Sequence, residues 1–162
     1  MSGADALSTD ETFADPILTD IGGERPSGYQ KAMGYRLAEW RDGHVVIEMP
    51  VGPQHLNRAN VVHGGVLASL IDTACGFAGS FAPSPGEQPV VVTLSLAASY
   101  VAPGRKGPLR VVGRVRGGGR SVFFASAEIF DGDGVLIAYG DGSFRYKRGE
   151  RLASIVTPGA EG

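Results

Sequence analysis

One carboxylate within an otherwise apolar segment is the residue of this 162-residue sequence best placed to do chemistry. Asp72 lies nine residues after His63, which is followed directly by Gly64 and Gly65. A carboxylate in apolar surroundings can act as a nucleophile or a general base. Backbone N–H groups at a helix start can stabilise negative charge on a carbonyl oxygen. Together these groups indicate chemistry at a carbonyl carbon.

The segment that carries these residues has the period of a buried helix, predicted over residues 62–80. Its apolar residues cover a broad arc: Val62, Val66, Leu67, Leu70, Ile71, Ala74, Phe77 and Ala78. The other side holds Gly65, Ser69, Asp72, Gly76 and Gly79. Each helical glycine costs up to about 1 kcal/mol relative to alanine. We therefore expect another backbone, or a ligand, to approach this side closely.

Composition and charge exclude several classes of function. The net charge is −2, and the basic residues between Arg105 and Arg120 alternate with apolar ones, so neither nucleic acid nor an acidic membrane is an expected partner. Neither a signal segment nor a membrane span is apparent. The single cysteine, Cys75, is expected to be a small packing residue. A lone cysteine is also consistent with a reducing, cytoplasmic location. His44 and His55 lack ligand partners at metal spacing, so neither a metal nor a cofactor is expected.

The chain divides into three parts by composition. Residues 1–28 are expected to form a flexible arm, with a short helix near 13–18, and residues 149–162 a flexible tail. Residues 29–148 show strands, one long helix and further strands, the pattern of a single α+β domain. Turn sequences such as Arg41-Asp42-Gly43 separate the strands. The predicted strands are 35–40, 45–51, 91–101, 109–116, 122–130 and 135–146.

The strand predicted over residues 91–101 alternates cleanly, with Thr93 on one side and Tyr100 on the other. Short connections between long strands predict an antiparallel meander that curves around the helix. One helix cannot cover both faces of such a sheet, so association through an edge or the outer face is expected.

The stretch from Gln54 to Gly65, with Asp72, Thr93 and Tyr100-Val101-Ala102-Pro103, resembles the hotdog-fold thioesterases. Within that superfamily it is most similar to the phenylacetate-pathway (PaaI-like) type and to the Arthrobacter-type 4-hydroxybenzoyl-CoA thioesterases. The resemblance implies one long central helix wrapped by a curved antiparallel sheet of five to six strands. One position departs from the family pattern, which usually has glycine where this chain has Asn60.

The resemblance also implies an activity and roles for individual residues. The expected reaction is hydrolysis of an aromatic or short- to medium-chain acyl-CoA to free acid and CoA. Asp72 would be the nucleophile or the general base, and the Gly64 amide would polarise the carbonyl. Asn57 would orient the nucleophilic water or the carboxylate. His63 would lie beside the thioester or orient the motif. Thr93 would form a hydrogen bond near the attacking water.

These residues also have structural interpretations. Asp72 could be capped by a partner's hydroxyl, and Asn57 could cap a turn, as asparagine often does. His63 could only hold its loop in place, and Thr93 could be an ordinary strand residue. Trp40, Tyr100 and Phe123 are most simply core or interface aromatics.

Substrate-binding residues are expected in three places. Gly65 and Gly64 would leave room for a bulky thioester. Phe77, with Phe81 and the strand around Val91, would line an acyl tunnel. Three residues in a turn before a strand are most simply a plain hairpin turn, which could in addition hold the CoA phosphates or pantetheine: Gly119, Arg120 and Ser121.

The spacing of Gly64 and Asp72 constrains the assembly. Eight helical residues span about 12 Å at 1.5 Å per residue, so both groups of one chain cannot reach one carbonyl. Two helices packed antiparallel about a two-fold axis would bring Gly64 of one chain near Asp72 of the other. The expected assembly is a homodimer with composite sites, further paired into a homotetramer as the resemblance implies.

Two other functions fit the same fold. A non-catalytic acyl-CoA-binding protein would have no use for a buried carboxylate beside the carbonyl. An enoyl-thioester hydratase usually has Asp and His close in sequence as an acid–base pair, and the nine-residue spacing here fits that arrangement poorly.

Overall fold

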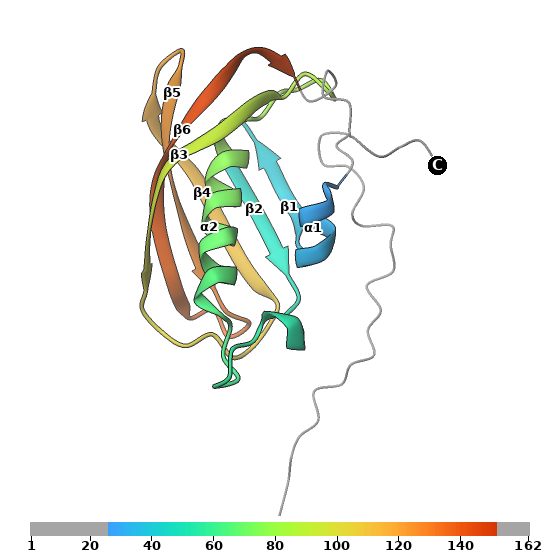
Figure 1. Ribbon diagram of the computed structural model, residues 1–162, viewed down its shortest axis with the longest axis vertical. Helices are drawn as coiled ribbons and strands as arrows, with labels where there is room; N and C mark the ends of the chain where they lie inside the picture. Colours follow the sequence, from blue (N-terminus) through green and yellow to red (C-terminus); the bar gives the residue numbers. More distant parts are fainter. Residues whose placement is uncertain (1–25, 152–162) are drawn as a thin grey trace, which may run out of the picture.

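The computed structural model describes residues 26–151, which form one curved antiparallel sheet around a long helix (Figure 1). The helix α2 spans Gly64–Gly79, two residues later at its start and one residue earlier at its end than predicted. The strands are β1 (Arg36–Arg41), β2 (His44–Met49), β3 (Pro89–Tyr100), β4 (Leu109–Gly118), β5 (Val122–Phe130) and β6 (Leu136–Arg151). The predicted α+β hotdog fold with a sheet of five to six strands is confirmed, and the sheet has six.

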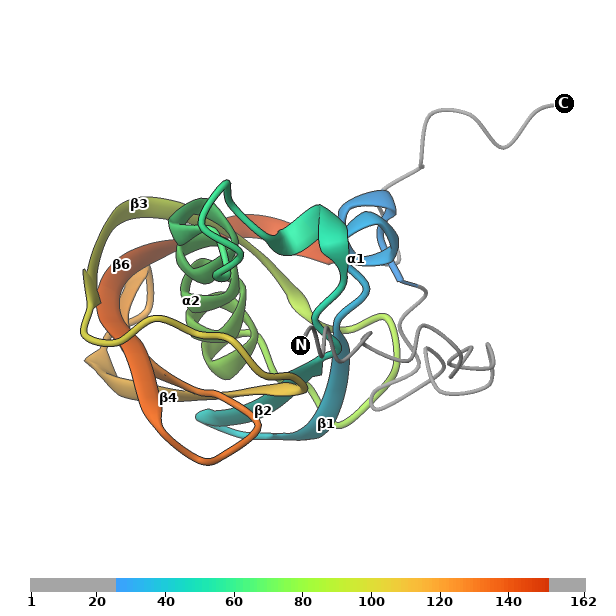
Figure 2. The same ribbon diagram turned by 90° about the horizontal axis from the view of Figure 1, so that it is seen from below.

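The strand order corrects the prediction of a simple meander. The sheet runs β1-β2-β4-β5-β6-β3, so β4, β5 and β6 form a meander, whereas β3 lies at the far edge, antiparallel to β6. The helix α2 connects β2 to β3 and crosses the concave side of the sheet, which curves around it (Figure 2). A chain that leaves β2, forms a helix and returns at the opposite edge can surround that helix with strands. The prediction failed because turn sequences show where strands end and not which strands pair.

The core lies between α2 and the inner face of the sheet. Leu70, Ile71 and Ala74 of α2 are fully buried there, together with Ile47 and Val111 from β2 and β4. Burying a large aliphatic side chain contributes about 1.5–3 kcal/mol. The apolar arc of the helix therefore fixes its rotation on the sheet, which in turn fixes where the opposite side points.

A β-bulge in β3 overturns the predicted clean alternation. The register with β6 shifts between Thr93, opposite Phe144, and Ser95, opposite Ser143. The extra residue Leu94 reverses which side chains face inward. As a result, both Thr93 and Tyr100 contact α2, although they are seven residues apart and strict alternation would put them on opposite faces.

A short helix that the sequence analysis did not predict precedes the sheet. The helix α1 (Gly28–Met33) begins at Ser27, whose hydroxyl accepts from the Gln30 N–H, and ends at Gly34 in the left-handed conformation (φ 73°). At the other end of the domain β6 extends to Arg151, past the predicted boundary at residue 148. The helix expected near residues 13–18 lies outside the described residues, as do residues 1–25 of the arm and 152–162 of the tail. Neither α1 nor α2 is long and apolar enough to span a membrane.

Candidate active site

The first turn of α2 exposes one backbone donor. His63 is the N-cap, and its Nδ1 accepts a hydrogen bond of 2.9 Å from the Gly65 N–H. The Gly65 amide is therefore already paired within the chain. Among residues 26–151 the Gly64 N–H donates no hydrogen bond. The positive end of the helix dipole therefore presents Gly64 as its free donor for an anionic oxygen.

The loop before the helix is held by Asn57. Its Oδ1 accepts from the N–H groups of Ala59 (2.8 Å) and Val61 (3.3 Å). In this chain the carboxamide oxygen of Asn57 therefore caps the turn, as the structural interpretation of this residue expects. Asn60 has φ 55°, a left-handed conformation that asparagine tolerates better than most residues. Asn60 therefore adopts a left-handed backbone conformation that the family's usual glycine would also adopt.

A buried histidine that the sequence analysis left without a role supports this loop. His55 ends the 3₁₀ turn Pro53–His55 and is 3% exposed. Its Nδ1 accepts from the Gly52 N–H at 2.9 Å, so Nε2 carries the proton and donates to the Met33 carbonyl at 3.0 Å. Its own carbonyl accepts from the His63 N–H at 2.8 Å. His55 therefore links α1 to the cap of α2.

Asp72 is the only charged residue of α2, and it is half-buried. The Thr93 hydroxyl of β3 donates to its Oδ1 at 2.7 Å. No other hydrogen bond to this carboxylate occurs within residues 26–151, so Oδ2 is available to a water molecule or a substrate. A hydrogen bond to a charged group is about twice as strong as one between neutral groups. Thr93 therefore fixes the orientation of the carboxylate.

Cys75, one turn along α2, is a packing residue. Its side chain is completely buried. Burial, and then the negative charge of Asp72, raise the pKa of the Cys75 thiol to about 12. At neutral pH the thiolate is absent, so this side chain does not supply a nucleophile.

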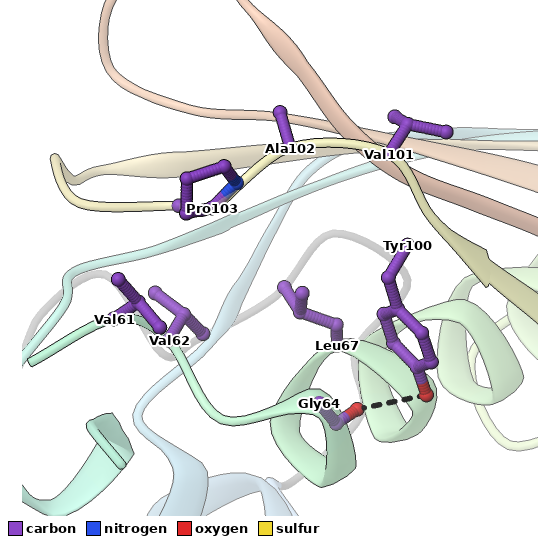
Figure 3. A pocket seen from close by; sticks show the side chains of 9 residues that line it. Val61, Val62, Gly64, Leu67, Tyr100, Val101, Ala102 and Pro103 are labelled. Atoms are coloured by element: carbon purple, nitrogen blue, oxygen red, sulfur yellow. Dashed lines mark hydrogen bonds between the residues drawn. The ribbon is translucent and has the colours of Figure 1, made fainter. Parts of the chain in front are cut away.

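Tyr100, at the end of β3, closes the other side of the helix start. Its hydroxyl donates to the Gly64 carbonyl at 3.2 Å, and a Cβ on Gly64 would lie 3.5 Å from the ring. The ring also borders a cavity of about 360 Å³ beside the first turn of α2 (Figure 3). From the sequence, Tyr100 was expected to be a core or interface aromatic. Its place in the family motif, at the end of the strand that also carries Thr93, was the signal for a position at the site.

Two of the predicted groups lie apart in one chain. Gly64 is the first residue of α2 and Asp72 the ninth, about 12 Å along the axis. The catalytic residues predicted from the sequence therefore form two clusters. One consists of the helix start with His63, Gly64 and the Asn57 loop, and the other consists of Asp72 with Thr93.

The remaining predicted binding residues lie toward the C-terminal end of α2. Phe77 stacks edge-on against Trp40, with centroids 5.3 Å apart, and its carbonyl accepts from the indole N–H at 2.7 Å. The β4–β5 turn (119–121) is exposed, and its Gly119 N–H bonds to the Val122 carbonyl. The Phe123 ring of the same chain packs closely against Gly79. In one chain these residues are therefore separate from the helix start.

Comparisons with known proteins agree with this architecture. Residues 59–138 match the family model described as the thioesterase superfamily. Over 114 residues the chain is 31% identical to the Saccharolobus solfataricus protein named "Putative esterase SSO2140", covering 70% of this chain and 79% of that protein. The solved structure of the conserved protein PA5202 from Pseudomonas aeruginosa has a TM-score of 0.68 at 33% identity, over 75% of this chain and 94% of that chain.

A second solved structure is the E. coli PaaI protein from the phenylacetic acid degradation operon. It has a TM-score of 0.67 at 28% identity, and the match covers 75% of this chain and 85% of that chain. The stretch that matches the family model contains the helix start, Asp72 and its strand partner Thr93. The chain belongs to the thioesterase superfamily.

Proposed function

We propose that this protein hydrolyses acyl-CoA thioesters, with each site shared between two chains of a homodimer. Family membership supports thioester hydrolysis in general. The observation that carries the residue assignment is the hydrogen bond that holds the Asp72 carboxylate against the inner face of β3 through Thr93. A binding protein would gain nothing from a half-buried charge held in this way, since burying a charge costs free energy.

The assembly follows from the edge position of β3. Within residues 26–151 this strand pairs only with β6, so its other edge presents backbone groups to a partner. Large apolar side chains along or just beyond it are about half exposed: Leu94, Tyr100 and Val101. A two-fold contact along this edge would lay two copies of α2 antiparallel, with Asp72 of one chain near Gly64 of the other. Further pairing into a tetramer would use other surfaces.

The chemistry divides between the two chains. The Gly64 N–H of one chain would donate to the thioester carbonyl oxygen and stabilise the negative charge that develops there. Asp72 of the other chain would either attack the carbonyl carbon or take a proton from an attacking water through its Oδ2. The carbon–sulfur bond breaks, CoA leaves as the thiol, and water supplies the oxygen and the proton of the products.

The first experiment measures release of free CoA thiol from a panel of acyl-CoAs. Asp72→Asn and Asp72→Ala should abolish turnover while the assembly, measured by sedimentation, persists. Thr93→Val should lower kcat by roughly 10- to 150-fold, because it removes one hydrogen bond to a charged group, worth about 1.5–3 kcal/mol. Asp141→Asn is the matched control, because Asp141 is an exposed carboxylate on the outer face of β6. Unchanged activity in both Asp72 variants would refute the mechanism.

The second experiment tests whether the site is shared between chains. Gly64→Pro removes the N–H donor, and proline is well tolerated at the first position of a helix. The extended backbone of His63 (φ −63°, ψ 137°) suits a residue before proline. Chains with Gly64→Pro and chains with Asp72→Asn should each be inactive. When they are unfolded together and refolded, half of the dimers would hold one intact site, so about a quarter of wild-type activity should return. No recovery in verified mixed dimers would contradict a shared site.

A further inference from the structure

The Gly64 donor stands at the end of a short hairpin that begins at His55. The His63 N–H donates to the His55 carbonyl at 2.8 Å, and Leu56 pairs with Val62 in an antiparallel bridge. Figure 3 shows the chain running from Val62 into the first turn of α2. Because Gly64 follows His63 directly, the side chain that fixes the base of this hairpin also fixes the direction of the Gly64 N–H.

The imidazole of His55 fixes that base through two hydrogen bonds. Its Nδ1 accepts from the Gly52 N–H at 2.9 Å, and its Nε2 donates to the Met33 carbonyl at 3.0 Å. Met33 is the last residue of α1, so its carbonyl has no partner within that helix. Figure 2 shows α1 beside the 3₁₀ turn that His55 ends. Because the ring is 3% exposed, rotating it would leave buried polar groups unsatisfied.

The two bonds have opposite polarity, which explains why a histidine occupies this position. A neutral imidazole carries one acceptor nitrogen and one N–H donor on a rigid ring. Asparagine and glutamine offer an amide at the δ or the ε position, so each of them can reproduce one of the two bonds. Burying a polar side chain costs free energy that an apolar one of similar size avoids. The gain from His55 therefore lies in the geometry that its two bonds enforce.

The direction of the Gly64 N–H matters because the proposed site is shared between chains. A donor stabilises an oxyanion when it lies about 2.7–3.1 Å from the oxygen that becomes charged. Asp72 of the partner chain must reach the same carbonyl, so the oxygen cannot move to follow a displaced donor. A displacement of about 1 Å can lower the rate about 100-fold. Neither ring nitrogen of His55 bonds to the Asp72 carboxylate or to Thr93 within residues 26–151.

We infer that His55 is the positioning residue of the Gly64 donor, because it holds the start of α2 against the end of α1. The inference rests on the proposed function and adds a residue and a helix to the parts of the chain on which turnover depends. The role of His55 belongs to the Gly64 half of the shared site. The Asp72 half of the same chain does not depend on it.

The first test measures kcat and KM of His55 variants with the acyl-CoA of the panel that wild type hydrolyses fastest. His55→Phe keeps a ring and removes both bonds, so kcat and kcat/KM should fall together by about 100-fold, because the donor acts in the transition state. His55→Asn keeps an acceptor for Gly52, and His55→Gln keeps a donor for Met33. Each of these two should have a kcat between those of His55→Phe and wild type.

Tyr146→Phe is the matched control at the other end of α2. The Tyr146 hydroxyl donates to the Gly79 carbonyl at 2.9 Å, so this variant also loses a partly buried hydrogen bond that anchors the helix. It should lower the thermal midpoint and leave kcat and KM unchanged. An equal loss of kcat in Tyr146→Phe and His55→Phe would assign the effect to lost stability and overturn the inference.

The second test uses mixed dimers to assign the defect to one half of the site. When His55→Phe and Asp72→Asn chains are refolded together, each mixed dimer has one site that combines a positioned Gly64 with an intact carboxylate. About a quarter of wild-type activity should therefore return, as for Gly64→Pro with Asp72→Asn. His55→Phe mixed with Gly64→Pro should recover nothing, because both chains then lack a positioned donor.

The outcomes distinguish this inference from the proposed function. If wild type hydrolyses none of the esters, or Gly64→Pro and Asp72→Asn do not complement each other, the proposed function fails and the inference fails with it. If that pair complements but His55→Phe with Asp72→Asn does not, or His55→Phe with Gly64→Pro does, only the inference is overturned. If His55→Phe does not fold, His55→Asn and His55→Gln take its place in the mixtures. A wild-type kcat in both would overturn the inference equally.

Discussion

The contact between α2 and the sheet at Gly113 gives a quantitative test of the fold that positions the site. Gly113 lies in β4, buried between Val45 of β2 and Ala127 of β5. A Cβ at this position would lie 2.5 Å from the carbonyl oxygen of Ala74 in α2. Ordinary contact begins near 3.4 Å, so the helix or the strand would have to move by about 0.9 Å. The obstacle is backbone, which no side-chain rotation can relieve.

Gly113→Ala should therefore destabilise the protein. Overpacking of a well-packed core costs about 1–3 kcal/mol, and Val45 and Ala127 on either side prevent the strand from moving away. A loss of about 2 kcal/mol corresponds to a fall of about 4–8 °C in the thermal midpoint of a domain this size. Circular dichroism and urea unfolding would measure both quantities.

The control for this substitution lies on the same strand. A Cβ on Gly117 would meet nothing within 4 Å, so Gly117→Ala should change the free energy of unfolding by no more than about 0.5 kcal/mol. Equal midpoints for Gly113→Ala and wild type would show that the helix does not rest on β4 as described. Equal losses in both variants would show that alanine in β4, not the helix contact, is responsible.

Two predictions concern titration. Burial, and then the charges of Arg41 and Arg114, lower the pKa of His44 below 6.5. The unfolded chain therefore binds a proton at His44 more readily than the folded chain does. As a result, the free energy of unfolding should rise with pH through the range just below 6.5. Urea titrations at several pH values should show the advantage of wild type over His44→Gln growing from pH 5 to pH 7; an advantage that shrinks as pH rises would contradict this sign. Burial raises the pKa of Cys75 to about 12. Iodoacetamide at pH 8 should therefore label native Cys75 no faster than the protein unfolds, but should label it rapidly in guanidinium. Equal labelling rates in both states would refute the assignment of Cys75 as a buried packing residue.

Local sequence patterns predicted the central helix and the strands because each depends on neighbouring residues. The apolar arc around Leu70 and Ile71 predicts a buried helix, and the glycine pair after His63 marks its start to within two residues. The short helix α1 was missed although Ser27 and Gly34, its capping residues, were visible in the sequence. Six residues are too few for a helical period to appear.

Features that depend on distant residues were not predictable in the same way. The position of β3 beside β6 depends on which edge remains open after β4, β5 and β6 have paired. The bulge at Leu94 depends on the partner strand, because the sequence from Val91 to Tyr100 alternates evenly and gives no sign of an extra residue. The role of His55 was hidden because its two partners are backbone groups, at Gly52 and Met33.

The bulge connects the two clusters of the candidate site. Without the extra residue in β3, Thr93 and Tyr100 would face opposite sides of the sheet, and either Asp72 would lose its hydrogen-bond donor or Gly64 would lose its cover. The strand that carries both contacts is also the free edge of the sheet, where the proposed partner chain would pair. A change that loosens that edge would then move Thr93 and Tyr100 along with it. Under the proposed function, assembly and turnover are therefore mechanically coupled through β3, because one strand orients the carboxylate, covers the helix start and forms the contact between chains.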